Sequence, residues 1–217
     1  MFSLHDKLTL TVIGRSGCGK GTQAKFLAKR LRKDGVRRLE TGRFLRQVLK
    51  KQNPTTEKAV ILMKEGGLFP FWFAAYTWLK DIIEKGAAAQ NMIFDGAPRR
   101  VWEAELLDEV IKWHKRPLPV CIYIDVFREE AYKRLILRQR VDDNSEAINN
   151  RLDFFETDVT PVVKYYEDAG RLLFVNGNQS VRKVWEEIDK KLAERLGGSW
   201  PREMNGIYNI DSGLNPE

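Results

Sequence analysis

A glycine-rich loop around a single lysine is the segment of this chain whose residue types best suit phosphate binding. Residues 14–23 have the sequence GRSGCGKGTQ and lie between an apolar alternating run at 7–14 and a run with the apolar spacing of a helix. A GxxxxGK loop in this context turns several backbone N–H groups toward one point, where Lys20 reaches the outer phosphate oxygens. The alternative is a glycine-rich turn with a solvated lysine, which the flanking strand and helix disfavour.

The other residues of the loop refine this prediction. Cys18 is expected to be a small filler rather than a reactive thiol, and Thr22 can place its hydroxyl on Mg²⁺, although it stands one position later than usual. The tight path of the backbone is permitted by Gly14, Gly17, Gly19 and Gly21.

A group of arginines follows in the second half of the chain. Arg134 and Arg138 stand four positions apart in a helical pattern, so they share a face and repel each other unless an anion lies between them. Arg140 follows Arg138 after one intervening residue, and Arg151 belongs to the next helical pattern. The alternative is that nearby carboxylates, of which Glu130 lies four positions before Arg134, neutralise these arginines as ordinary surface pairs.

The elements that must position these residues form an α/β pattern. Apolar runs alternate with long helical patterns, which predicts three layers with a parallel sheet in the middle; the expected strands are residues 7–14, 91–96, 120–126 and 171–177. Residues 41–85 hold short helical patterns without a clear strand, which indicates an inserted helical subdomain. The stripe at 181–196 should pack on the sheet, and 197–217 should form a loosely held tail. Residues 1–40 and 86–196 then form the core.

Charge and cysteine content limit the classes of partner. The net charge of +7 favours an anionic partner: a nucleotide, a nucleic acid or a membrane surface. Cys18 and Cys121 form no CxxC pair, so neither a zinc ribbon nor a disulfide framework is expected. The beginning of the sequence lacks signal-peptide features, and the longest apolar run, 68–79, is shorter than the ~20 residues of a membrane span. We therefore expect a cytoplasmic protein without a membrane partner.

Four motifs in order carry a resemblance to a known family. They are GCGKGTQ at 17–23, ETGRFLR at 40–46, FDGAPR at 94–99, and RLILRQRVDDNSEAINNRL at 134–152 followed by TPVVKYY at 160–166. Together they resemble the short-lid form of the adenylate kinase family of nucleoside monophosphate kinases, over about residues 8–196. The resemblance implies the P-loop fold and Mg²⁺-dependent transfer of the ATP γ-phosphoryl group to a monophosphate, most often AMP, giving two ADP. It also implies a monomer, with ATP as co-substrate and no zinc.

The resemblance also assigns roles to individual residues. The residues implied in catalysis are Lys20, Arg99, Arg138, Arg140 and Arg151. Those implied in ATP binding are Gly17, Cys18, Gly19, Lys20, Gly21, Thr22, Arg134 and Gln179. Those implied in binding the monophosphate are Thr41, Arg46, Gly67, Leu68, Phe69, Gly96, Arg99, Glu103, Arg140 and Arg151. Thr22 and Asp95 would hold Mg²⁺ indirectly through water, residues 41–85 would bind the acceptor, and 134–151 would form the lid. Asp95 as a helix or turn cap is the alternative.

The chain departs from the family pattern at three places. Arg43 replaces an acidic residue near the metal, and either weakens Mg²⁺ placement or turns to solvent. Glu103 replaces the glutamine that binds adenine; an ionised carboxylate only accepts hydrogen bonds, which suits guanine better, unless Glu103 faces solvent. Only Gln139 separates Arg138 from Arg140, so the lid is very short and ATP hydrolysis without acceptor is expected.

These departures leave other functions open. GMP or a pyrimidine monophosphate is an alternative acceptor, and a regulatory nucleotide-binding protein without efficient transfer is an alternative of another class. A specific nucleic-acid-binding role is disfavoured, because the arginines gather at phosphate-binding motifs and no RRM, KH or zinc-finger pattern occurs. Phe69, Phe71 and Trp72 are expected to pack inside the acceptor subdomain rather than to stack on a base.

Overall fold

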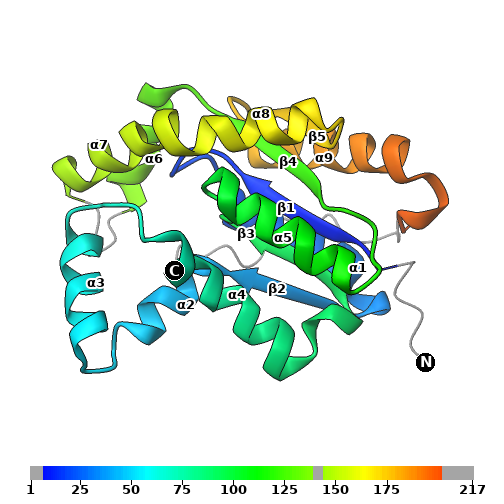
Figure 1. Ribbon diagram of the computed structural model, residues 1–217. Coiled ribbons are helices and arrows are strands. Elements are labelled where there is room, and N and C mark those ends of the chain that lie inside the picture. The colour runs from blue at the N-terminus through cyan, green and yellow to red at the C-terminus, as the bar shows by residue number, and fades with distance from the viewer. Residues whose placement is uncertain (1–6, 139–143, 202–217) are drawn as a thin grey trace.

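The computed structural model describes residues 7–138 and 144–201, and its centre is a parallel sheet (Figure 1). The strands lie in the order β2-β3-β1-β4-β5, and all neighbouring pairs run parallel. The strands are β1 (Thr9–Ile13), β2 (Val36–Glu40), β3 (Asn91–Asp95), β4 (Val120–Asp125) and β5 (Leu172–Asn176). The α/β prediction with a parallel sheet is therefore confirmed.

Strand β2 is an addition to the strands expected from the sequence. Its residues VRRLE include two adjacent arginines, so the segment lacks the apolar run that marks the other strands. Among the described residues it is an edge strand that pairs with β3 alone, with Arg38 opposite Ile93 and Glu40 opposite Asp95. An edge strand is half exposed, so polar side chains are compatible with it, and apolar patterning alone could not reveal it.

Helices cover both faces of the sheet. The helices of the described residues are α1 (Lys20–Leu31), α2 (Thr41–Val48), α3 (Pro54–Lys64), α4 (Phe71–Lys85), α5 (Val101–Trp113), α6 (Arg128–Arg138), α7 (Ser145–Phe154), α8 (Thr160–Asp168) and α9 (Val181–Leu196). A short π-helical turn, Phe155–Val159, joins α7 to α8. On one face α1 and α9 form a core with Ile93, whereas Met92 and Phe94 point to the other face and contact α4 and α5. Successive residues of β3 thus serve opposite cores.

Residues 41–85 contain three helices and no strand, and they have a small core of their own. Leu45 of α2, Ala59 of α3 and Phe73 of α4 are buried together with Phe69, whose ring stacks on Phe73 at 5.5 Å. Phe69 therefore packs as expected. Phe71 and Trp72 do not, because they are 44% and 55% exposed. Figure 1 shows α2 and α3 beyond the end of the sheet, apart from the helices that cover its faces.

The last helix packs as its apolar stripe predicts. Four apolar residues of α9 are buried in the core that this helix forms with the sheet: Val184, Trp185, Ile188 and Leu192. The chain beyond the helix stays attached for a few residues, because Trp200 is buried and its indole N–H donates to Asp189 Oδ1 over 2.9 Å. A loosely held tail therefore does not begin at Gly197, and residues 202–217 lie outside the described part.

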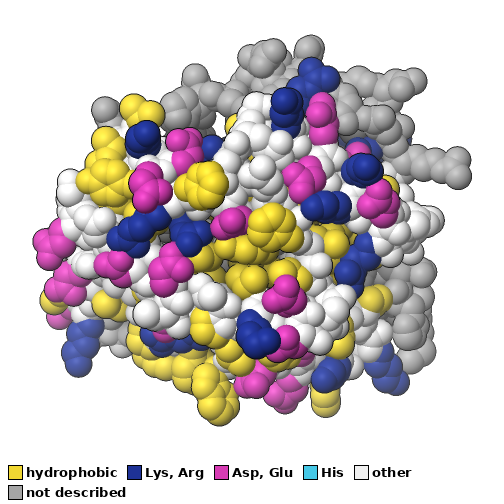
Figure 2. All heavy atoms as spheres, turned by 90° about the horizontal axis from the view of Figure 1, so that it is seen from above, with side chains coloured by type: hydrophobic (Ala, Val, Ile, Leu, Met, Phe, Trp, Pro, Cys, Tyr) yellow, Lys and Arg dark blue, Asp and Glu magenta, His cyan; other side chains and the backbone are white. Residues whose placement is uncertain are grey.

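The surface carries both signs of charge. Figure 2 shows Lys and Arg side chains interspersed with Asp and Glu and with hydrophobic side chains on one face of the molecule. None of the helices in the described ranges, 7–138 and 144–201, combines the length and apolar character that crossing a membrane requires.

Candidate active site

The glycine-rich loop lies between the end of β1 and the start of α1. The carboxyl ends of parallel strands lie on the same side of a sheet, so the loop after β1 lies beside the residues that follow the neighbouring strand β3. Gly17 has φ 85°, and a Cβ there would lie 2.6 Å from the Ala131 carbonyl oxygen, so this position requires glycine. The Lys20 ammonium group donates to the carbonyls of Gly14 and Arg15 over 2.6 and 2.7 Å. Lys20 therefore lies over its own loop, and Cys18 is buried as expected of a filler.

A cavity beside this loop brings together three of the predicted catalytic residues. Lys20 comes from α1, Arg99 from the segment after β3, and Arg151 from α7. The full lining is Ile13, Gly14, Ser16, Lys20, Gly96, Pro98, Arg99, Arg151, Phe154, Phe155 and Val159. We call this the cationic cavity. Burial lowers the pKa of the Arg99 guanidinium, and the charge of Arg151 lowers it too, while Glu103 and Asp95 oppose both effects. Cations gathered in one cavity favour a bound anion.

A second cavity adjoins the first, because Gly96 and Arg99 line both. Its lining is Thr41, Leu45, Leu68, Phe69, Phe71, Ala74, Gly96, Arg99, Arg100 and Glu103. We call this the apolar cavity, since apolar side chains of residues 41–85 form much of its wall. The predicted acceptor-binding residues Thr41, Leu68, Phe69 and Glu103 meet there. Gly67 and Arg46 do not line it; Arg46 lies 3.7 Å from the Glu40 carboxylate.

Glu103 is buried in the first turn of α5, with 1% of its surface exposed. Its Oε2 accepts a hydrogen bond from the Arg99 backbone N–H over 2.7 Å, and its Oε1 accepts one from the Trp78 indole N–H over 3.2 Å. Burial raises the pKa of this carboxyl, while the two hydrogen bonds lower it. The alternative in which Glu103 faces solvent is therefore wrong.

Asp95 ends strand β3 and is paired with an arginine that the sequence analysis did not single out. Its Oδ2 lies 2.5 Å from Arg38 Nη2, and Arg38 also lies 3.3 Å from the Glu40 carboxylate. A carboxylate and a hydroxyl are the kinds of ligand that Mg²⁺ takes, directly or through water, so Asp95 and Thr22 fit a magnesium ion in kind. Arg43 is exposed and turns to solvent. The two adjacent arginines of β2 can be seen in the sequence, but the sequence does not show that they pair with Asp81 and Asp95.

The predicted ATP-binding and lid residues are not all brought together. Arg134 Nε donates to Glu130 Oε1 over 2.7 Å and its Nη2 to the Gly177 carbonyl over 3.2 Å, so the ordinary ion pair considered above does form. Gln179 donates to Glu187 over 2.8 Å. Arg138 ends α6 and lines neither cavity. Gln139 and Arg140 lie outside the described residues.

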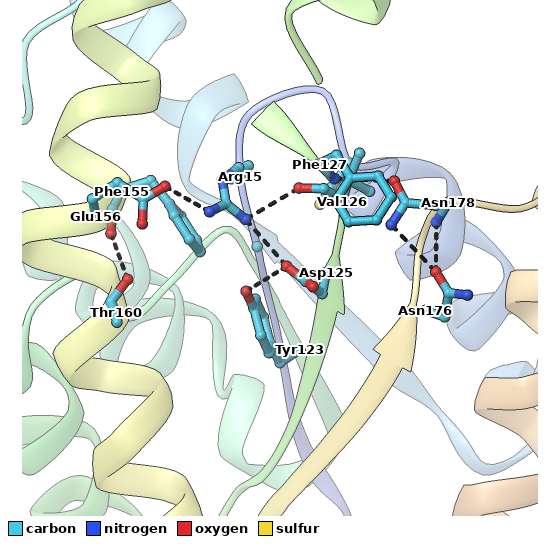
Figure 3. Close-up of polar contacts among 12 residues, drawn as sticks. Arg15, Tyr123, Asp125, Val126, Phe127, Phe155, Glu156, Thr160, Asn176 and Asn178 are labelled. Atoms are coloured by element: carbon cyan, nitrogen blue, oxygen red, sulfur yellow. Dashed lines mark hydrogen bonds and ion pairs between the residues drawn. The ribbon is translucent and has the colours of Figure 1, made fainter. Parts of the chain in front are cut away.

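Arg15 ties the loop to the segment after α7 (Figure 3). Its guanidinium lies 4.6 Å from the centroid of the Phe155 ring, and it donates to Asp125 over 3.1 Å and to Glu156 over 2.5 Å. Phe155 follows closely on Arg151, so this contact holds the helix that carries Arg151 against the phosphate-binding loop. The sequence analysis missed this role, because the partners lie more than a hundred residues away.

Comparison with known proteins decides the family. Residues 12–171 match the family model described as adenylate kinase. The chain is 33% identical over 183 residues to "Adenylate kinase 1" of Nostoc sp., covering 84% of this chain and 97% of the relative. The chain belongs to the adenylate kinase family. An "Adenylate kinase" of Prochlorococcus marinus is 30% identical over 189 residues, with 86% and 100% coverage, and one of Bacteroides fragilis is 30% identical over 187 residues, with 84% and 97% coverage.

Membership in the adenylate kinase family makes the chain a nucleoside monophosphate kinase. The parallel sheet and the glycine-rich loop at the carboxyl end of its central strand, β1, agree with the P-loop fold of that family. Within 7–138 and 144–201, no group of three or more His, Cys, Asp or Glu side chains is placed to hold a metal ion.

Proposed function

We propose that this member of the adenylate kinase family transfers the γ-phosphoryl group of Mg·ATP to AMP and forms two ADP. The observation that carries the proposal is the adjacency of the two cavities. Arg99 and Gly96 line both, while Lys20 lies in the cationic cavity and Glu103 in the apolar cavity. A phosphate donor and a base-bearing acceptor bound in these cavities would meet at Arg99.

The residues of the cationic cavity would position and neutralise the phosphates. Phosphoryl transfer needs little covalent chemistry from the protein, so catalysis rests on orientation and on charge stabilisation. Backbone N–H groups of residues 17–22 and Lys20 would bind the donor phosphates, while Arg99 and Arg151 would bind the oxygens of the moving group. Arg138 and Arg140 would join them from a lid at 134–151. When bound at Thr22 and Asp95 through water, Mg²⁺ would neutralise charge on the phosphates.

The residues of the apolar cavity would bind the acceptor. Leu68, Phe69 and Phe71 offer apolar contact to a base, and Thr41 of the same lining would contact the nucleoside monophosphate. Arg46 and Gly67 lie outside this lining in the helical segment 41–85 and would contact the acceptor from there. Exclusion of water by this wall would favour transfer to the acceptor over hydrolysis.

GMP is a second candidate acceptor, and Glu103 is the observation that favours it. Its carboxylate is buried within the lining of the apolar cavity. An ionised carboxylate can accept from both the N1–H and the N2–H₂ of guanine, whereas adenine N1 is itself an acceptor. The choice between AMP and GMP therefore depends on the protonation and orientation of one side chain.

The test is nucleoside diphosphate production from Mg·ATP with AMP, GMP, CMP and UMP offered separately. Rapid turnover with AMP that Lys20→Ala abolishes and Lys25→Ala retains would support the proposal, because Lys25 is an exposed residue of the same helix. A preference for GMP would support the second candidate. Absence of acceptor-dependent product with all four would contradict both. A sample without acceptor measures the hydrolysis expected from the short lid.

A further inference from the structure

Arg38 places a guanidinium group beside the first turn of α1. A Cβ at Gly21 would lie 3.5 Å from Arg38 Nη2 and 3.6 Å from Asp95 Oδ2, so the Arg38–Asp95 pair directly adjoins the phosphate-binding loop. The side chain of Arg38 is 20% exposed and that of Asp95 is 8% exposed. Water therefore screens this pair only in part.

The pair changes the charge at the position where a cation would be held. Asp95 is the carboxylate that we propose for Mg²⁺, and its Oδ2 is 2.5 Å from Arg38. A second nearby carboxylate, Glu40, also lies within 3.3 Å of Arg38 and is shared with Arg46. A metal ion near Asp95 must share this carboxylate with a fixed positive charge and is repelled by that charge.

The adjacent arginine shows that this placement is specific to Arg38. Arg37 points to the opposite side of β2, as successive strand residues do. Its guanidinium pairs with Asp81 of α4, with Nη2 at 2.6 Å from Oδ2. Arg37 and Arg38 thus have the same charge and the same kind of partner, but only Arg38 adjoins the phosphate-binding loop.

We propose that Arg38 supplies part of the positive charge that a magnesium ion otherwise supplies to bound ATP. The inference rests on the proposed binding of ATP at the glycine-rich loop. Its consequence is that the chain binds metal-free ATP with an affinity close to that for Mg·ATP. Arg38 is thereby a determinant of which ionic form of the nucleotide the loop accepts.

The experiment is calorimetric titration of ATP in EDTA and in excess MgCl₂, which measures binding without turnover. For the unmodified chain we expect the two dissociation constants to agree within about fivefold, the lower end of ordinary coupling. Arg38→Gln should raise the preference for Mg·ATP by about tenfold relative to the unmodified chain. The matched control Arg37→Gln removes the same charge one residue away and should leave the preference unchanged.

Each outcome is informative. An unmodified chain that prefers Mg·ATP by much more than fivefold overturns the proposal, and this holds even if Arg38→Gln does not fold. Equal preferences in Arg38→Gln and the unmodified chain also overturn it, as does an equal response to Arg37→Gln. Arg38→Lys retains the positive charge and should keep the preference near that of the unmodified chain. If Arg38→Gln prefers Mg·ATP no more than the unmodified chain does, and the unmodified chain still transfers phosphate to an acceptor, only the role of Arg38 is refuted. If the unmodified chain binds ATP in neither buffer, the proposed function is contradicted as well.

Discussion

The indole N–H of Trp78 donates a hydrogen bond to the buried carboxylate of Glu103 over 3.2 Å. This contact joins α4, which ends the helical segment 41–85, to the first turn of α5. Together with the bond from the Arg99 backbone, it engages both oxygens of Glu103. The orientation of this carboxylate in the apolar cavity is therefore determined by its neighbours before any base is bound.

Glu103→Gln should shift the choice of base toward AMP. An amide donates to adenine N1 and accepts from N6, whereas an ionised carboxylate offers only acceptors. One mismatched hydrogen bond costs about 1–3 kcal/mol, so we expect the ratio of kcat/KM for AMP to that for GMP to rise by about 5- to 150-fold. Steady-state kinetics with both acceptors measures it. Glu105→Gln, at an exposed position of the same helix, is the control and should change nothing. An unchanged ratio in Glu103→Gln would make Glu103 a purely structural residue.

Glu103 should contribute a loss of stability as the pH rises. Burial raises the pKa of its carboxyl above the ordinary value of 4.5. The folded state then holds a proton that the unfolded state releases, so the free energy of unfolding decreases from pH 4.5 up to the raised pKa. Urea denaturation across this range should show a component that Glu103→Gln removes and Glu105→Gln retains. Identical pH profiles in all three proteins would contradict the expected shift.

Arg99→Ala and Arg151→Ala should each lower turnover by about 10³-fold or more. An arginine that binds the moving phosphoryl group contributes on this scale, and both side chains line the cationic cavity with Lys20. Arg128→Ala is a suitable control, because Arg128 pairs with Asp153 at 2.6 Å and lines neither cavity. Near-normal turnover in either active-site variant would remove that arginine from the proposed mechanism.

Arg15→Ala should destabilise the protein by about 1–3 kcal/mol. The substitution removes the partner of Asp125 and Glu156 and the contact with the Phe155 ring. Urea denaturation measures the loss. Arg182→Ala, which removes an exposed pair with Glu186 on α9, should cost no more than about 0.5 kcal/mol. Equal effects of the two substitutions would show that the Arg15 contacts contribute little to stability.

Much of the fold could be predicted because it depends on local patterns. The glycine-rich loop is marked by the spacing of its glycines and lysine, the buried strands by apolar runs, and α9 by an apolar stripe with the period of a helix. Strand β2 could not be found this way, because its residues VRRLE show no apolar run. It is held by pairing with β3, by the ion pairs of Arg37 and Arg38, and by the burial of Leu39 in the core that covers this face of the sheet.

The sequence by itself determined the phosphate-binding loop, the α/β class and the family, since these follow from residue types at short, regular spacing. The tertiary structure alone decided which charged residues meet across different elements, whereas a pair within one helix, such as Glu130 and Arg134, could be expected from its spacing. Arg38 of β2 pairs with Asp95 of the neighbouring strand β3. Arg15 of the phosphate-binding loop pairs with Glu156 of the π-helical turn. Glu103 of α5 is buried beside Trp78 of α4 and accepts its indole hydrogen bond. Such pairs depend on strand order and helix packing, which bring together residues that no local pattern connects.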